Sequence, residues 1–184
     1  MTYYAVIDTN VIVSAMLKWS STPGNVMKGI FEGKIIPLLN DDIVKEYRLV
    51  LSRPKFHLTE LIVENFVSSI EEQGIFLDAD KLDVELPDPK DIVFYEVVME
   101  GRKKNDAYLV TGNGKHFPSV PFVITPREML ELLKKYRFGL LPRREPGHFC
   151  KMRRILMEIV TGSMTVVRLP QFYYHFTTIG HNDS

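Results

Sequence analysis

Short apolar runs alternate with helix-like segments along most of the chain, and this alternation limits the possible folds more than any other feature. The first run, Tyr3–Ile7, is β-branched and aromatic with no polar face, as expected of a strand buried on both sides. Similar runs follow at 35–39, 75–78, 107–111 and 121–125. The pattern is typical of βαβ units and predicts an α/β/α sandwich, in which helices cover both faces of a central, mostly parallel sheet.

Helices are predicted between the strands from apolar residues at helical spacing and from capping residues. The first, near 10–18, is expected to begin with Thr9 or Asn10 as its N-cap, and the third with Asp41 or Asp42. The other predicted helices lie near 23–33, 59–73, 88–101 and 126–136.

The helix–strand alternation ends near Arg137, which divides the 184 residues into a predicted domain, 1–137, and a C-terminal extension, 138–184. The extension carries a net charge of about +3 and the domain about −3, although the whole chain is neutral. Because the whole chain is neutral, any basic surface for nucleic acid must be local. The extension is expected either to pack on the domain or bind a partner, or to be a poorly ordered tail.

Three features indicate a cytoplasmic protein without a membrane span. The single cysteine, Cys150, excludes an intrachain disulfide. The N-terminal apolar run lacks a basic flank and is interrupted by Asp8, unlike a signal peptide. No uninterrupted apolar stretch is long enough to cross a bilayer.

Four polar residues are expected near the carboxyl ends of the strands, where open parallel sheets bind ligands. Asp8 follows the first strand, Glu46 lies early in the helix after the second, Asp91 begins the helix before the fourth, and Asn113 follows the fourth. Facing carboxylates repel one another unless a cation neutralises them, and hard oxygen ligands suit Mg²⁺ or Mn²⁺. Together these residues predict a metal site.

Each of these residues also has a purely structural interpretation. Asp8 can cap the helix that follows it, and Glu46 can be a solvated helix residue. Asp88 is expected to cap the turn that contains Asp91, and Asn113 suits the turn "TGNG". The metal site is favoured by the order and placement of the residues together.

Four blocks of sequence resemble the PIN-domain family, and more narrowly the PIN-family toxins of toxin–antitoxin operons. They are "VIDTNVIVSA" at 6–15, "EYRLVLSRPKF" at 46–56, "DPKDIVFYEVVM" at 88–99 and "AYLVTGNGKHFP" at 107–118. The resemblance covers roughly residues 2–136 and implies a Rossmann-like α/β/α fold. It also implies a Mg²⁺- or Mn²⁺-dependent endoribonuclease that hydrolyses single-stranded RNA, with a homodimeric state and a possible cognate antitoxin as partner.

The resemblance also assigns roles to residues. Asp8, Glu46 and Asp91 match the first three acids of the family and are the expected metal ligands. Asn113 stands where the family usually has a fourth acid, and it is carried as a catalytic candidate despite this departure. An amide brings no charge, so one metal is still expected, whereas a second would be held less well. Asp106 precedes its strand and is expected at the opposite end from the cleft.

Substrate contacts are predicted beside the acids. Thr9 and Asn10 can hydrogen-bond either the carboxylates or a phosphate at the helix N-terminus. Lys115 and His116 are candidate phosphate contacts, although exposed lysines on helices are more often only solvated. Lys45, Arg48 and Lys90 are weaker candidates of the same kind.

Three other functions compete with the nuclease. With Asn113 in place of an acid, the protein could bind RNA or a partner without cutting it. A phosphotransferase could use Asp8 as a nucleophile, but such enzymes usually carry a second Asp at the position of Asn10. A plain helix-packing scaffold would show no response to divalent ions.

Overall fold

The computed structural model describes residues 2–135, so the predicted extension, 138–184, lies outside the described residues. Within the described part, five parallel strands form one sheet in the order β3-β2-β1-β4-β5. The strands are β1 (Tyr3–Ile7), β2 (Ile35–Leu39), β3 (Ile75–Phe76), β4 (Ala107–Val110) and β5 (Val123–Ile124). The predicted α/β fold with a parallel sheet is confirmed.

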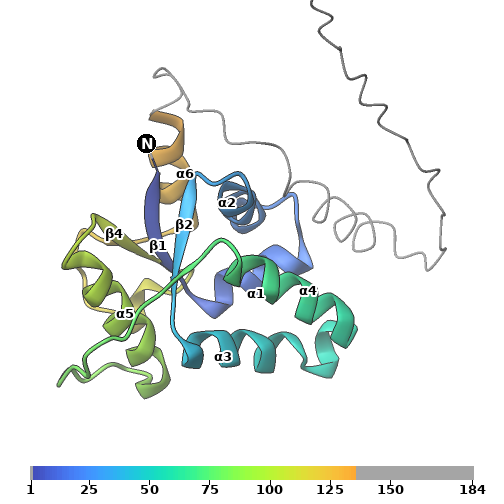
Figure 1. Ribbon diagram of the computed structural model, residues 1–184, viewed down its shortest axis with the longest axis horizontal. Helices are drawn as coiled ribbons and strands as arrows, with labels where there is room; N and C mark the ends of the chain where they lie inside the picture. Colours follow the sequence, from blue (N-terminus) through green and yellow to red (C-terminus); the bar gives the residue numbers. More distant parts are fainter. Residues whose placement is uncertain (1, 136–184) are drawn as a thin grey trace, which may run out of the picture.

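Helices cover both faces of this sheet (Figure 1). One face is covered by α1 (Thr9–Leu17), α2 (Thr22–Phe31), α4 (Glu60–Glu71) and α6 (Pro126–Lys135), and the other by α5 (Ile92–Arg102). The remaining helix, α3 (Asp41–Leu51), lies across the carboxyl ends of the strands and contacts both α1 and α5. Among helices of residues 2–135, none is long and apolar enough to cross a membrane.

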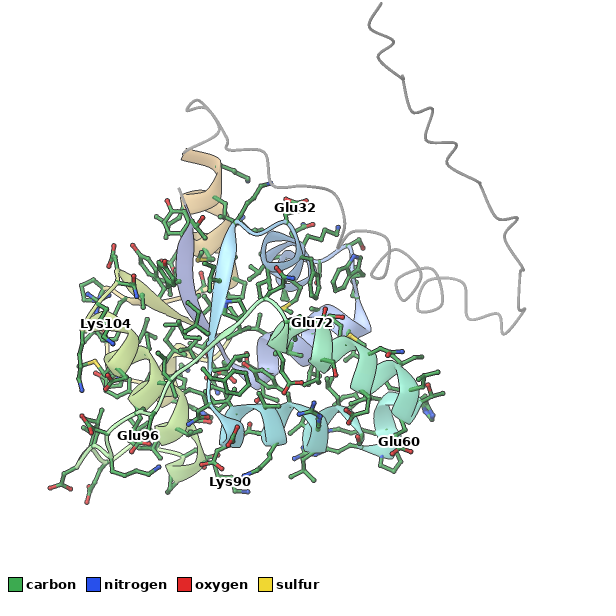
Figure 2. The ribbon with its side chains drawn as sticks, viewed as in Figure 1. Glu32, Glu60, Glu72, Lys90, Glu96 and Lys104 are labelled. Carbon is green, nitrogen blue, oxygen red and sulfur yellow. The ribbon has the colours of Figure 1, made fainter. Side chains whose placement is uncertain are left out.

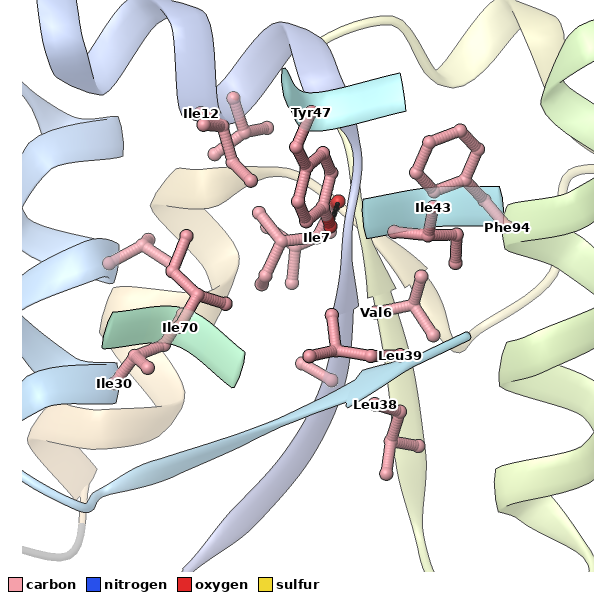
Figure 3. Close-up of a cluster of buried hydrophobic side chains, with 14 of the residues drawn as sticks. Val6, Ile7, Ile12, Ile30, Leu38, Leu39, Ile43, Tyr47, Ile70 and Phe94 are labelled. Carbon is pink, nitrogen blue, oxygen red and sulfur yellow. Dashed lines mark hydrogen bonds between the residues drawn. The ribbon is translucent and has the colours of Figure 1, made fainter. Parts of the chain in front are cut away.

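The core lies between the sheet and these helices. Alternate residues of β1 point to opposite faces, and Val6 and Ile7 are both buried among apolar side chains from helices (Figure 3). Because helices cover both faces, β1 needs no polar side, which explains its continuous apolar sequence.

Pro37 occupies the middle of β2 although proline cannot donate a ladder hydrogen bond. The Tyr3 N–H donates to the Lys34 carbonyl, and the Leu77 N–H to the Leu39 carbonyl. Backbone groups of even-numbered residues in β2 therefore face β1, and those of odd-numbered residues face β3. The Pro37 nitrogen thus faces β3, whose pairing with β2 begins only at Leu38.

The structure corrects the predicted caps of two helices and confirms Asp88 as the predicted cap of a third. Helix α1 is capped by Asp8, as the structural interpretation of that residue allowed, and not by Thr9 or Asn10. Helix α3 is capped by Asn40, whose side chain accepts the Ile43 N–H. The predicted helix at 88–101 begins instead as a short 3-10 helix, η2 (Pro89–Asp91), capped by Asp88. The α-helical part, α5, starts at Ile92.

Candidate active site

Asp8 directly follows β1 and is the N-cap of α1. The register pairs Ile7 with Val110, so the next residues, Asp8 and Thr111, are neighbours at the ends of adjacent strands. The Thr111 hydroxyl donates to Asp8 Oδ2 at 2.5 Å. The Asn10 side chain donates to the same oxygen at 2.6 Å, and the Asn10 backbone N–H donates to Oδ1 at 3.1 Å. Asp8 is thus a helix cap and a buried carboxylate held in one orientation, only 6% exposed.

Glu46 reaches the same place from α3. The Thr9 hydroxyl donates to Glu46 Oε1 at 2.7 Å, which joins α3 to the first residue of α1. The neighbouring Tyr47 is fully buried, and its hydroxyl donates to the backbone carbonyl of Ile7, the residue before Asp8 (Figure 3). Two successive residues of α3 therefore bind the junction between β1 and α1.

Asp91 lies at the start of α5 and contacts the segment after β4. Asp91 Oδ2 lies 2.8 Å from Nδ1 of His116, in the short 3-10 helix η3 (Gly114–His116). The other ring nitrogen, Nε2, lies 2.7 Å from the side-chain nitrogen of Asn113. Asn113 therefore joins the site through His116.

The acids affect one another electrostatically. Burial raises the pKa of Asp8; hydrogen bonds from Thr111 and Asn10 oppose this rise, and the charge of Asp91 adds to it. Burial also raises the pKa of Glu46, against the hydrogen bond from Thr9 and with the charges of Asp8, Asp91 and Asp88. The structure thus brings the three predicted acids within electrostatic range of one another.

Two of the predicted cations, Lys90 and Lys115, are chain neighbours of Asp91 and His116, whereas Arg48 pairs with Glu64 and Glu71 of α4. Lys115 is exposed in η3, and Lys90 is exposed in η2 between Asp88 and Asp91. Figure 2 shows Lys90 at the same end of the molecule as the start of α3. Asp106 directly precedes β4 and pairs with Arg102 at the end of α5. It therefore lies at the amino ends of the strands, whereas Asp8 lies at their carboxyl ends.

A comparison with known families adds an observation that is independent of the strand order and of the three acids. A family model described as PIN domain matches residues 4–115. The chain belongs to the PIN domain family. Comparisons with curated proteins and with solved structures give no match. PIN domains are typically metal-dependent nucleases and generally bind divalent metals.

The donor set of this PIN domain fits a divalent ion in its chemistry. The donors are hard oxygens, and the raised pKa values of Asp8 and Glu46 indicate negative charges that a cation would stabilise. Within residues 2–135, however, no three Asp, Glu, His or Cys side chains form a ready-made metal site. Each of the three acids instead contacts a hydrogen-bond partner. Mg²⁺ keeps several of its waters, so carboxylates can hold it through water without converging closely.

Sequence reasoning missed Thr111 and Tyr47. Thr111 is 1% exposed and donates to Asp8, and its place directly after β4 was the only available signal. From sequence Tyr47 is only one of the apolar residues at helical spacing in its helix, although a buried phenol needs a hydrogen-bond partner. Thr9 and Asn10, predicted to contact either the acids or a phosphate, hydrogen-bond the acids in the structure.

Proposed function

We propose that this PIN domain is a Mg²⁺- or Mn²⁺-dependent endoribonuclease that hydrolyses phosphodiester bonds of single-stranded RNA. The observation that supports the proposal is that Asp8, Glu46 and Asp91, from three separate elements, lie close enough for the charge of Asp91 to raise the pKa of both Asp8 and Glu46. An acidic cluster would repel the phosphates of RNA unless a cation lay between them, so a metal and an RNA substrate together account for it.

Each acid has a defined role in the proposed mechanism. Asp8, Glu46 and Asp91 would hold the ion directly or through water. A divalent ion so held supplies an activated water and charge stabilisation for in-line attack at phosphorus. Thr111 and Asn10 keep Asp8 oriented, and Thr9 does the same for Glu46. Attack by water leaves a 5′-phosphate and a 3′-hydroxyl.

The substrate would approach past the exposed cations. Lys90 and Lys115 flank the acids and would contact the phosphates beside the cleaved bond. The positive charges of these two lysines would attract RNA to a surface whose centre is acidic. We also propose, from membership of the family, a toxin role with a cognate antitoxin and a homodimeric state.

Cleavage of a short end-labelled single-stranded RNA by the full-length protein tests this function. With Mg²⁺ or Mn²⁺ we expect 5′-phosphorylated fragments, and with a chelator none. Asp8→Asn should lower the rate by more than about 100-fold, since loss of a group that merely supports a ligand already lowers metal affinity or activity by about 10–100-fold. Asp78→Asn, which removes an exposed carboxylate, is the matched control and should cleave as the wild type does. Equal cleavage by both variants would overturn the proposal, as would no cleavage by the wild type.

A PIN-like protein that binds RNA or a partner with weakened catalysis is the second candidate. It is favoured by one observation: the fourth acidic position is Asn113, whose side chain lies against His116. This candidate predicts that the wild type shifts RNA on a native gel without cutting it, and that Asn113→Asp gains cleavage. Under the first proposal the wild type already cuts.

A further inference from the structure

The loop after β4 contacts two acids that come from different elements. At one end, Thr111 donates to Asp8, which begins α1. At the other end, the ring of His116 lies 2.8 Å from Asp91, which precedes α5. Asp8 and Asp91 are 83 positions apart in sequence, and this loop hydrogen-bonds to both.

Hydrogen bonds within the loop join these two contacts. The Asn113 backbone N–H donates to the Thr111 hydroxyl oxygen at 2.9 Å. The Asn113 side-chain nitrogen lies 2.7 Å from His116 Nε2. With the amide donating to Nε2, the ring proton sits on Nδ1 and is donated to Asp91. The result is an unbroken chain from Asp8 through Thr111, Asn113 and His116 to Asp91.

We propose that His116 is a positioning residue that holds the Asp91 carboxylate in place for metal binding, and that Asn113 orients its ring. The inference rests on the proposed function and deepens it. It replaces the predicted phosphate contact of His116 with a contact to an acid. It also gives Asn113 a role in the site other than that of a weak fourth ligand.

The geometry favours this role. His116 engages Asp91 Oδ2, which leaves Oδ1 available for a ligand. Acids that bind metals are commonly fixed by such outer partners. The Asp91 side chain is only 16% exposed and that of His116 39%, so the acid is the more buried of the two.

Two substitutions separate the two ring nitrogens. The amide nitrogen of Asn can take the place of Nδ1, and that of Gln the place of Nε2. His116→Asn therefore keeps a donor to Asp91, whereas His116→Gln keeps only a polar contact with Asn113. We expect His116→Gln to bind Mn²⁺ about 10–100-fold more weakly than the wild type, and His116→Asn to lose only a few-fold.

Calorimetric titration of Mn²⁺ into each full-length variant measures this difference. Matched melting temperatures of the two variants would show that the difference in affinity is not a general loss of structure. Equal Mn²⁺ affinities of the two variants would overturn the proposal. If both variants also kept the wild-type Mn²⁺ affinity and lost only RNA binding, His116 would be restored as a phosphate contact.

The tautomer of His116 provides a test that needs no metal. In the metal-free protein at about pH 8, where an ordinary histidine is neutral, ¹⁵N NMR should find the ring proton on Nδ1, with the signal identified by its loss in His116→Gln. A proton on Nε2 would overturn the proposal. Failure of the wild type to bind Mn²⁺ would instead remove the proposed function, and the tautomer would still decide whether His116 donates to Asp91.

Discussion

At the scale of single residues, Asp8 and Glu46 each accept hydrogen bonds in the structure. Thr111 and Asn10 donate to Asp8, and Thr9 donates to Glu46. These hydrogen bonds favour the charged carboxylates, but burial outweighs them, and the pKa of both acids is raised. Without a metal, the charged forms of Asp8 and Glu46 are therefore less favourable than those of free carboxylates.

Glu46→Gln tests that charge without removing the hydrogen bond, because Gln retains an oxygen to accept from Thr9. The folded-state pKa of Glu46 lies above its ordinary value of 4.5. The native state therefore binds its proton more tightly than the unfolded state, and stability falls as pH rises through the folded-state pKa. At about pH 7, without metal, the variant should be more stable than the wild type by less than about 1 kcal/mol, since half-exposed charges are partly screened.

Urea denaturation in a chelator measures this effect, and the difference should fade as pH falls below 4.5. Glu131→Gln removes an exposed charge from α6 and is the matched control, expected to leave stability unchanged. A less stable Glu46→Gln protein at neutral pH would contradict the assigned cause.

At the scale of elements, α3 is fastened to the end of β1 at one buried point. The Tyr47 hydroxyl donates to the Ile7 carbonyl, and Tyr47 also packs near Phe94 of α5, with ring centroids 6.4 Å apart. Since Glu46 is the residue before Tyr47 in α3, this contact helps to fix where Glu46 lies at the junction of β1 and α1.

Tyr47→Phe should lower the free energy of unfolding by about 1–3 kcal/mol, because it leaves a buried carbonyl without its partner. It should also weaken Mn²⁺ binding, though less than Asp8→Asn does. Tyr108→Phe removes the same atom from an exposed hydrogen bond to Asp106 and should change stability by less than about 0.5 kcal/mol. Equal losses in the two variants would show that the Tyr47 contact has no special weight.

The elements themselves were largely predictable, but their first residues were not. Apolar runs and helical periodicity located every strand and every α-helix of residues 2–135, although not the short 3-10 helices, since burial of an element usually leaves a direct mark on its sequence. Thr9 or Asn10 as the cap of α1, and Asp41 or Asp42 as the cap of α3, were wrong by one or two residues, although the sequence also allowed Asp8 as the cap of α1. Polar residues that can cap stand side by side in both places, and only backbone conformation decides which one accepts the N–H.

At the scale of the whole molecule, the site depends on contacts that sequence spacing does not reveal. The grouping of Asp8, Glu46 and Asp91 followed from parallel topology, which brings the carboxyl ends of strands to one edge. The pairing of His116 with Asp91 did not, because it depends on how the loop after β4 folds back toward the start of α5. The same holds for Tyr47 and Ile7, which are 40 positions apart.

The most direct test of the account is calorimetric titration of Mn²⁺ into the full-length wild-type protein and into Asp8→Asn, with Asp78→Asn as the charge-matched control. We predict saturable binding by the wild type and by Asp78→Asn, and binding to Asp8→Asn weakened by more than about 10-fold. No binding by the wild type, or equal affinity in all three proteins, would contradict the claim that the acids at the carboxyl ends of the strands hold a divalent ion.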